Sequence, residues 1–190
     1  MYPVRTVAPT ETPVTLAEVK AHLRVDHSDE DELISGLIDA ATAHIDGYSG
    51  ILGRALVTQS WKIEVDDWDD LDLPLSPVAS ITSVKYYDGS NAQQTLAATV
   101  YQLVNRAGGS CAELKYGQTW PVTYTRADAI EVIFVAGYGA ASAVPQAIKL
   151  AMLLLIGHWY ANREAVSTDA GSPLPLAVES LLAPYRRVGV

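Results

Sequence analysis

The residues most able to do chemistry in this chain are its four histidines and its single cysteine. The histidines, at His22, His27, His44 and His158, do not have the spacing of the HExxH zinc motif or of any other paired metal ligands. His22 and His44 lie in segments with helical periodicity, where packing or surface roles are expected. Cys111 is alone, so it can form neither an intrachain disulfide nor a multi-cysteine metal site. We expect it to be a buried or half-buried thiol.

An acidic stretch near the middle of the chain is the next candidate. It places six carboxylates in the nine positions from Glu64 to Asp72. Such a stretch could hold a hard cation, because calcium takes several oxygen ligands. It lacks the Asp-x-Asp-x-Asp-Gly spacing and the distal glutamate of an EF-hand loop. A solvated acidic loop is therefore the preferred interpretation, and no metal is predicted.

A glycine pair, Gly137-Tyr138-Gly139, stands where a nucleotide-binding turn could lie, between a predicted strand and a predicted helix. It lacks the third glycine of a dinucleotide fingerprint and the Lys-Ser/Thr of a P-loop. The chain also has no Gly-x-Ser-x-Gly nucleophile elbow. The sequence thus predicts no catalytic residues and no cofactor, and we expect the protein not to be an enzyme.

Composition limits the partners. The chain has 190 residues, with 13 Lys and Arg against 22 Asp and Glu, a formal net charge of −9. A protein that binds nucleic acid tightly usually carries a basic face. Because acidic residues outnumber basic ones here, tight DNA binding is disfavoured. Charged residues make up only 18%, below the roughly 25% of ordinary domains, which is consistent with a surface partly covered by other subunits. Arg186-Arg187 is the only adjacent basic pair.

No segment suggests a membrane. The first residues lack the apolar region of a secretory signal, and the most apolar run, Leu150 to Ile156, is far shorter than the roughly 20 residues that span a bilayer. We expect synthesis in the cytoplasm and no membrane partner.

Helical patterns lie toward both ends of the chain. Residues 1–13 contain three prolines and are predicted to form an extended arm. Thr15 and Glu18 have the spacing of a capping box, which predicts a short helix to about Val25. A second helix is predicted from about Asp29 to Tyr48, because apolar residues recur there every four positions. Further helices are expected from Ile148 to Arg163 and around residues 176–182.

The middle of the chain has strand patterns. Residues 57–65 alternate between the two faces of a half-buried strand, and residues 81–87 end at the turn signal Asp88-Gly89. Shorter strands are expected at 101–104, 112–116 and 130–135. The predicted fold is α+β, mainly an α-helical bundle of about four helices with a β-rich domain inserted between the second and third. Its boundaries are an N-terminal arm at 1–13, the bundle at 14–54 and 140–166, the β-rich domain at 55–139, and a loop, short helix and C-terminal arm at 167–190.

Several segments, taken together and in order, resemble one family. They are TLAEVKAHLR from Thr15, the long helix ending near Gly50, PVASITSVKYYDG from Pro77, IEVIFVAGYG from Ile130, VPQAI from Val144 and LAPYR from Leu182. The set is similar to the head–tail connector (adaptor) proteins of long-tailed phages, prophages and gene-transfer-agent particles. The resemblance extends over nearly the whole chain.

The resemblance implies a structural role in the neck of a virion or phage-like particle. Such connectors form a ring, typically a dodecamer, beneath the portal protein, and can remain monomeric in isolation. The ring extends the channel for double-stranded DNA without sequence-specific binding, and it offers a platform for the stopper or tail-terminator protein. The C-terminal arm reaches the portal, which implies as partner-binding residues Leu181, Leu182, Pro184, Tyr185, Arg186, Arg187 and Val188. Acids of the central stretch are candidates to face the channel: Asp66, Asp67, Asp69, Asp70 and Asp72.

Two alternatives stay open at this point. A tail-completion or neck protein of the same particle would also form a ring but would bind tail components. A small ligand-binding module would instead need a deep pocket, for which the tryptophans Trp61, Trp68 and Trp120 are the available lining.

Overall fold

A computed structural model describes residues 2–69, 71–106, 109–162 and 176–187. The chain divides into two compact units. One, called here the β unit, comprises residues 1–10 and 58–138, and the other, the helical unit, comprises residues 11–57 and 139–190. The helices and the antiparallel sheets confirm the predicted α+β class, with helix and strand in similar shares of the described residues.

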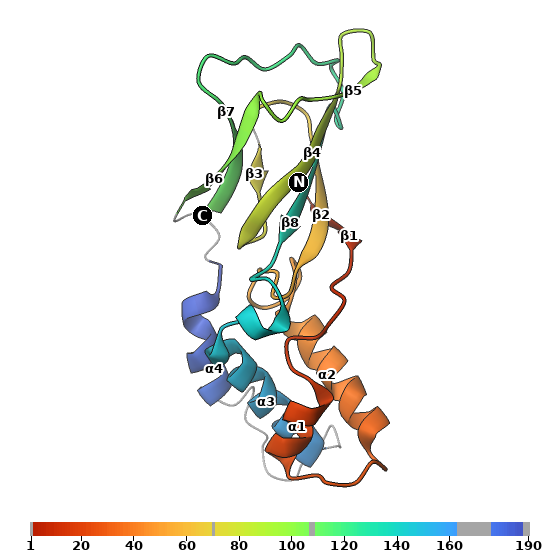
Figure 1. Cartoon of the computed structure of the whole chain (residues 1–190), viewed down its shortest axis with the longest axis vertical. Coiled ribbons are helices and arrows are strands. Elements are labelled where there is room, and N and C mark those ends of the chain that lie inside the picture. Colours follow the sequence, from red (N-terminus) through yellow and green to blue (C-terminus); the bar gives the residue numbers. More distant parts are fainter. Residues whose placement is uncertain (1, 70, 107–108, 163–175, 188–190) are drawn as a thin grey trace. The chain divides into compact units, whose positions relative to one another are not determined.

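The helical unit contains α1 (Leu16–Leu23), α2 (Asp31–Ile45), α3 (Gln146–Ala161) and α4 (Leu176–Leu182), with short 3₁₀ turns η1 (Ala141–Ala143) and η2 (Ala183–Tyr185). The predicted capping box at the start of α1 is present, with Thr15 and Glu18 bonded to each other. Helices α1 and α2 pack on α3, and α4 packs on its other side (Figure 1). The apolar stripes meet in a core of fully or nearly fully buried residues: Val19, Ile34, Ile38, Ala41, Ile45, Ile148, Ala151, Met152, Leu155, Ile156, Val178 and Leu182.

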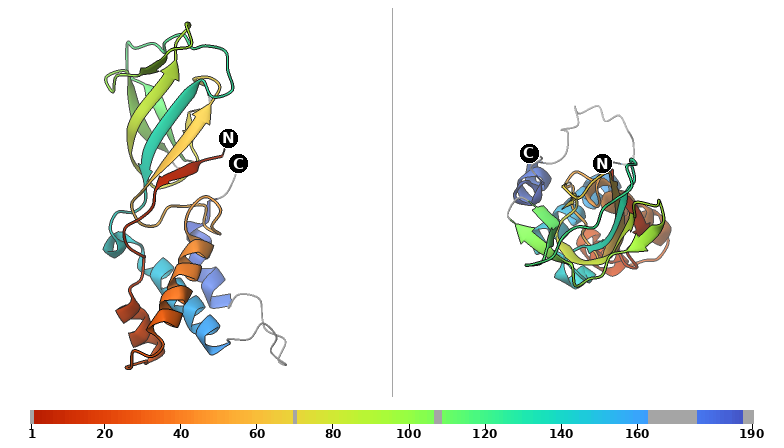
Figure 2. Two further views of the ribbon diagram at one scale, coloured as in Figure 1. Left: turned by 90° about the vertical axis from the view of Figure 1, so that its right-hand side faces the viewer. Right: turned by 90° about the horizontal axis from the view of Figure 1, so that it is seen from above.

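The β unit contains two antiparallel sheets. The larger has the strand order β1-β2-β8-β4-β5, formed by β1 (Val4–Val7), β2 (Gln59–Val65), β8 (Ile130–Ala136), β4 (Val78–Tyr87) and β5 (Gln93–Thr95) (Figure 2). The smaller has the order β3-β7-β6, formed by β3 (Asp72–Leu73), β7 (Gly109–Leu114) and β6 (Tyr101–Arg106). Burial alternates along β2 and β8, as the sequence pattern predicts for strands with one face on the core.

The two faces of the large sheet differ in chemistry. One face buries Trp61, Ile63, Val132 and Phe134. The opposite face carries a row of ion pairs across β2, β8 and β4, in which the carboxylate of Glu131 lies 3.8 Å from Lys62 Nζ and 3.3 Å from Lys85 Nζ. This clear division fixes the register of the central strands.

The N-terminal residues differ from the expected arm. Residues Val4 to Val7 form an edge strand, with Val4 opposite Lys62 and Arg5 opposite Trp61. The strand was not expected because three prolines lie near this segment. Proline lacks the backbone N–H that would donate a hydrogen bond to a neighbouring strand, so it usually argues against a strand. The short strands β3 and β5 were also not predicted, since two or three residues are too few for a periodic pattern to emerge.

Candidate docking surfaces

The C-terminal segment, defined here as residues 176–187, is attached to its own unit. Val178 and Leu182 are both 0% exposed and fasten α4 to α3. Complete burial of two such side chains contributes about 1.5–3 kcal/mol each. The described part of the predicted C-terminal arm is therefore packed on the helical unit.

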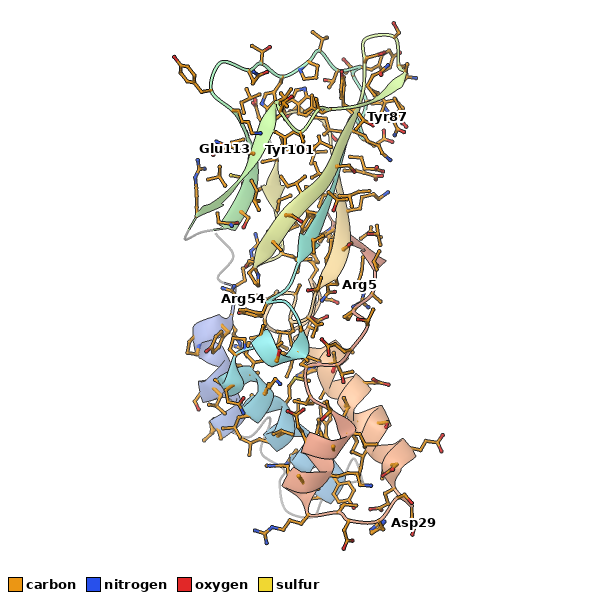
Figure 3. All side chains as sticks on the ribbon, in the orientation of Figure 1. Arg5, Asp29, Arg54, Tyr87, Tyr101 and Glu113 are labelled. Carbon is orange, nitrogen blue, oxygen red and sulfur yellow. The ribbon has the colours of Figure 1, made fainter. Side chains whose placement is uncertain are left out.

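Hydrogen bonds extend this attachment beyond α4. The backbone N–H of Arg187 donates to the carbonyl oxygen of Leu52 at 2.9 Å. The side chain of Arg54, labelled in Figure 3, donates from Nε to the carbonyl oxygen of Tyr185 at 2.5 Å. Gly53 has φ +60°, and a Cβ there would lie 3.4 Å from the Cβ of Arg187, so the two backbones pass close together.

The loop that receives the segment, residues 46–57, is itself tightly built. The carboxylate of Asp46, only 7% exposed, accepts the backbone N–H of Leu56 at 2.7 Å. The N–H of Gly47 donates to the carbonyl of Arg54 at 2.7 Å. These bonds end α2 at Ile45 rather than at Tyr48 as predicted, because Asp46 leaves the helical conformation.

The predicted partner-binding residues fall into two groups. Leu182 is buried, and it contributes to the core of the helical unit. Leu181 and Tyr185 are half-buried, whereas Pro184, Arg186 and Arg187 are exposed. Val188 lies outside the described residues. Of the predicted partner-binding residues that the structure describes, the exposed ones are thus a proline and two arginines, on a chain whose net charge is negative.

The predicted acidic loop is also exposed. Asp66, Asp67, Asp69 and Asp72 all face solvent, and Asp70 lies outside the described residues. The Asp67 carboxylate accepts the backbone N–H of Asp69 at 3.0 Å, which is a turn contact. Within the described ranges, no three His, Cys, Asp or Glu side chains are grouped so that they could hold a metal ion.

The tryptophans do not act as one group. Trp68 stacks on Trp120 with ring centroids 4.6 Å apart and planes 1° apart, and its Nε1–H donates to the carbonyl of Pro121 at 2.8 Å. Trp61 is instead buried in β2, with the Arg5 guanidinium 5.8 Å from its ring centroid. The tryptophan pair anchors the acidic loop to residues 120–121.

Cys111 has the properties expected of a structural thiol. It lies in β7 and is 8% exposed. Burial, and then a hydrogen bond to Glu113, raise the pKa of the Cys111 thiol above its usual value, which keeps it from forming the reactive thiolate.

Sequence reasoning missed the residues that hold the C-terminal segment. Arg54 and the glycines at positions 47, 50 and 53 act together only because the loop folds back on α2. A signal was present, since three glycines at intervals of three after a helix mark a tight path for the backbone. The spacing of the glycines does not indicate that this loop would contact the C-terminal segment.

Among the described residues, no helix is both long and apolar enough to cross a membrane.

Comparison with known proteins agrees with this architecture. Residues 13–105 match the sequence profile of the phage gp6-like head-tail connector protein family. No curated protein sequence matches the chain. A chain in the neck of an empty GTA (gene transfer agent) particle, computed with C6 symmetry, is similar over 100% of this chain and 97% of its own length, with 26% identity and a TM-score of 0.79.

A second solved structure gives the same result. In the virion of a native GTA particle, one chain has 27% identity and a TM-score of 0.79, again over 100% of this chain and 97% of that one. A chain in the neck of a native GTA particle computed with C12 symmetry shares the fold, with a TM-score of 0.71 at 24% identity. Residues 13–105 are thus similar in sequence to the phage gp6-like head-tail connector family, and the whole chain is similar in fold to chains of GTA particles.

Proposed function

We propose that this protein is a connector subunit in the neck of a phage-like particle, where copies form a ring beneath the portal. The main observation in support of this proposal is that the full length of the protein is similar to a chain in the neck of a GTA particle. In this role the ring extends the DNA channel and gives the stopper or tail-terminator protein a surface on which to dock. The role is structural and requires no catalytic step.

The helical unit is proposed to build the ring, as a bundle with the β unit inserted between α2 and α3. Contacts around a ring join two different faces of each subunit. Large apolar side chains are exposed on three described helices of this unit: Leu33 on α2 at 41%, Leu150 on α3 at 40% and Leu176 on α4 at 79%. Apolar side chains on different helices support a contact of this kind.

The exposed end of the C-terminal segment is proposed to bind the portal. Arg186 and Arg187 offer guanidinium groups that suit carboxylates on a partner. Pro184 adds a rigid apolar contact beside them, while α4 holds the segment in place through its buried residues.

The acidic character of the chain suits the passage of DNA. A net charge of −9 repels the phosphate backbone, so DNA can move past without adhering.

Co-sedimentation with portal rings from the same genome tests the proposal. Deleting the C-terminal segment would remove the buried Val178 and Leu182, so a surface substitution is the better probe. We expect the wild type to bind in a fixed ratio and Arg186→Glu to bind about tenfold more weakly, a loss of about 1.4 kcal/mol. Arg24→Glu, at an exposed arginine elsewhere in the helical unit, is the matched control and should bind normally.

The other results are equally informative. If the wild type binds tails and not portal rings, the protein is a tail-completion protein instead. If Arg186→Glu binds portal as the wild type does, the connector role stands and the C-terminal assignment is wrong.

A further inference from the structure

The connection between β7 and β8, residues 115–129, is long and contains no helix or strand. Loops of this length inside compact domains are usually functional or disordered. This one is held in place along its length. At one point Trp120 stacks on Trp68, and Pro121 accepts the hydrogen bond from Trp68 Nε1.

Two further attachments hold the loop to the β4–β5 hairpin. The N–H of Tyr124 donates to the carbonyl of Tyr87, labelled in Figure 3, at 2.9 Å. The Arg126 guanidinium lies 3.8 Å from the centroid of the Tyr87 ring. It also donates to Asn91 at 3.1 Å and, through two bonds, to the carboxylate of Asp128. Charge-assisted, bidentate bonds of this kind are among the stronger ones.

The fixed loop presents apolar side chains to solvent. Tyr116 is fully exposed, Val122 is 81% exposed and Tyr124 is 44% exposed. Val122 stands between two points of attachment, directly after the proline that Trp68 binds. The fold has already ordered this backbone, so a partner would bind it at a reduced entropic cost. Exposed apolar groups on a rigid frame mark an interaction surface.

The rim of this surface is acidic. Asp66, Asp67 and Asp69 are exposed and belong to the same short loop as Trp68, so the stack brings them beside residues 120–122. We define the Trp68–Trp120 surface as these three carboxylates with Trp68, Trp120 and Val122.

Charge decides what can occupy this surface. DNA is excluded, because phosphates and three carboxylates repel each other. A second copy of the β unit is disfavoured, since its sequence carries ten acidic against six basic residues. The occupant that would complement the Trp68–Trp120 surface in charge and polarity is a protein surface with lysine or arginine around an apolar centre.

We propose that the Trp68–Trp120 surface docks a different protein of the neck, one whose contacting face is basic around apolar side chains. This inference rests on the proposed connector function. It gives Asp66, Asp67 and Asp69 a role at the rim of a protein interface, in place of the channel-facing role that the family resemblance suggested.

The experiment uses heads and tails purified from a strain that lacks the gene for this chain. Labelled full-length protein is added to each, and binding is measured at low and at high salt. The test variants are Val122→Ser and Asp69→Lys. The matched controls are Val4→Ser, at a 55% exposed valine of the same unit, and Asp39→Lys, at an exposed acid of α2.

We expect both test variants to bind either heads or tails at least about tenfold more weakly than the wild type, as for a residue at an interface centre or an opposed charge. Both controls should bind normally. Binding of Asp69→Lys should also depend less on salt, because an attractive rim contact has been removed.

Several results would overturn the inference. The inference fails if both test variants bind heads and tails as tightly as the wild type does. It also fails if Asp69→Lys binds more tightly than the wild type, because that would mean an acidic partner. A change in self-association of Val122→Ser, seen by sedimentation of the chain alone, would identify a second copy as the occupant. Loss of capture by linear double-stranded DNA in that variant would identify DNA. If the wild type binds neither heads nor tails, the connector function itself fails, and this inference falls with it.

Discussion

Gly50 is the residue with least freedom in the loop that receives the C-terminal segment. A Cβ at this position would lie 2.4 Å from the carbonyl oxygen of Asp46 and 2.5 Å from that of Ile45. Those atoms are backbone, so they cannot turn aside as a flexible side chain would. The glycine therefore permits the sharp exit from α2.

Gly50→Ala should destabilise the protein by about 1–3 kcal/mol, the usual cost of forcing an extra carbon into a packed site. Urea unfolding measures this. The control is Gly36→Ala, inside α2, where a Cβ would meet nothing within 4 Å. It should stabilise by roughly 0.5–1 kcal/mol, because alanine is the better helix former. Equal effects of the two substitutions would show that the crowding at Gly50 is relieved by movement of the loop.

Glu18 is the residue for which the structure predicts a pH effect. Its carboxylate accepts the Thr15 backbone N–H at 2.7 Å and the Thr15 hydroxyl at 2.9 Å. These bonds, the backbone bond first, lower the pKa of Glu18 below its usual value. A lowered folded-state pKa means that the stabilising effect is present above the unfolded pKa of about 4, and is lost as pH falls through the folded pKa.

We expect the urea midpoint of Glu18→Gln to depend less on pH than that of the wild type between neutral pH and about pH 3. The comparison cancels the other acids that titrate in this range, such as Asp128, whose pKa Arg126 lowers. Parallel pH profiles would mean that the capping box persists in the unfolded chain.

At the scale of elements, α4 and η2 depend on a distant loop for their final position. Arg54 is the side chain that joins them, through its bond to the Tyr185 carbonyl. The sequence separates the two residues widely, so the contact exists only after α2 and α4 have both packed.

Arg54→Met keeps the aliphatic stem and removes the donor. We expect the backbone amides of Arg186 and Arg187 to exchange with deuterium about tenfold faster, since a hydrogen bond from a charged group contributes about 1.5–3 kcal/mol. Arg24→Met is the control, at an exposed arginine after α1. Unchanged exchange in Arg54→Met would mean that the buried Val178 and Leu182 and the backbone bond from Arg187 to Leu52 hold the segment without the Arg54 side chain.

At the scale of the whole molecule, the net charge and the exposed apolar side chains have opposite effects on self-association. The net charge of −9 acts against self-association, while the exposed leucines of the helices, Leu33, Leu150 and Leu176, offer only limited apolar contacts. A template that collects subunits would shift this balance.

The isolated chain should therefore sediment as a monomer at low salt. Heads that lack it should bind it until a whole multiple of six copies is reached, in keeping with the symmetry of the similar GTA neck. Densitometry of saturated, purified heads gives the ratio. A stable ring in solution without heads would show that the helical contacts alone suffice for assembly.

The sequence by itself determined the class of fold and carried the resemblance to one family. An alternating pattern located β2 and an apolar repeat every four residues located α2, because a long element must show one face to the core and repeat it along its length. A strongly apolar run located α3. The capping box of α1 was predictable for a similar reason, since both of its partners lie within one turn. Ordered local motifs were likewise enough to suggest the connector family.

Only the tertiary structure decided how the candidate surfaces are built. It placed Leu182 in the core while leaving Arg186 exposed, and it turned the N-terminal residues into an edge strand. It also joined Trp68 to Trp120 across more than fifty positions of sequence. Such contacts depend on chain reversals and on the burial that accompanies them, and neither leaves a periodic trace in the sequence.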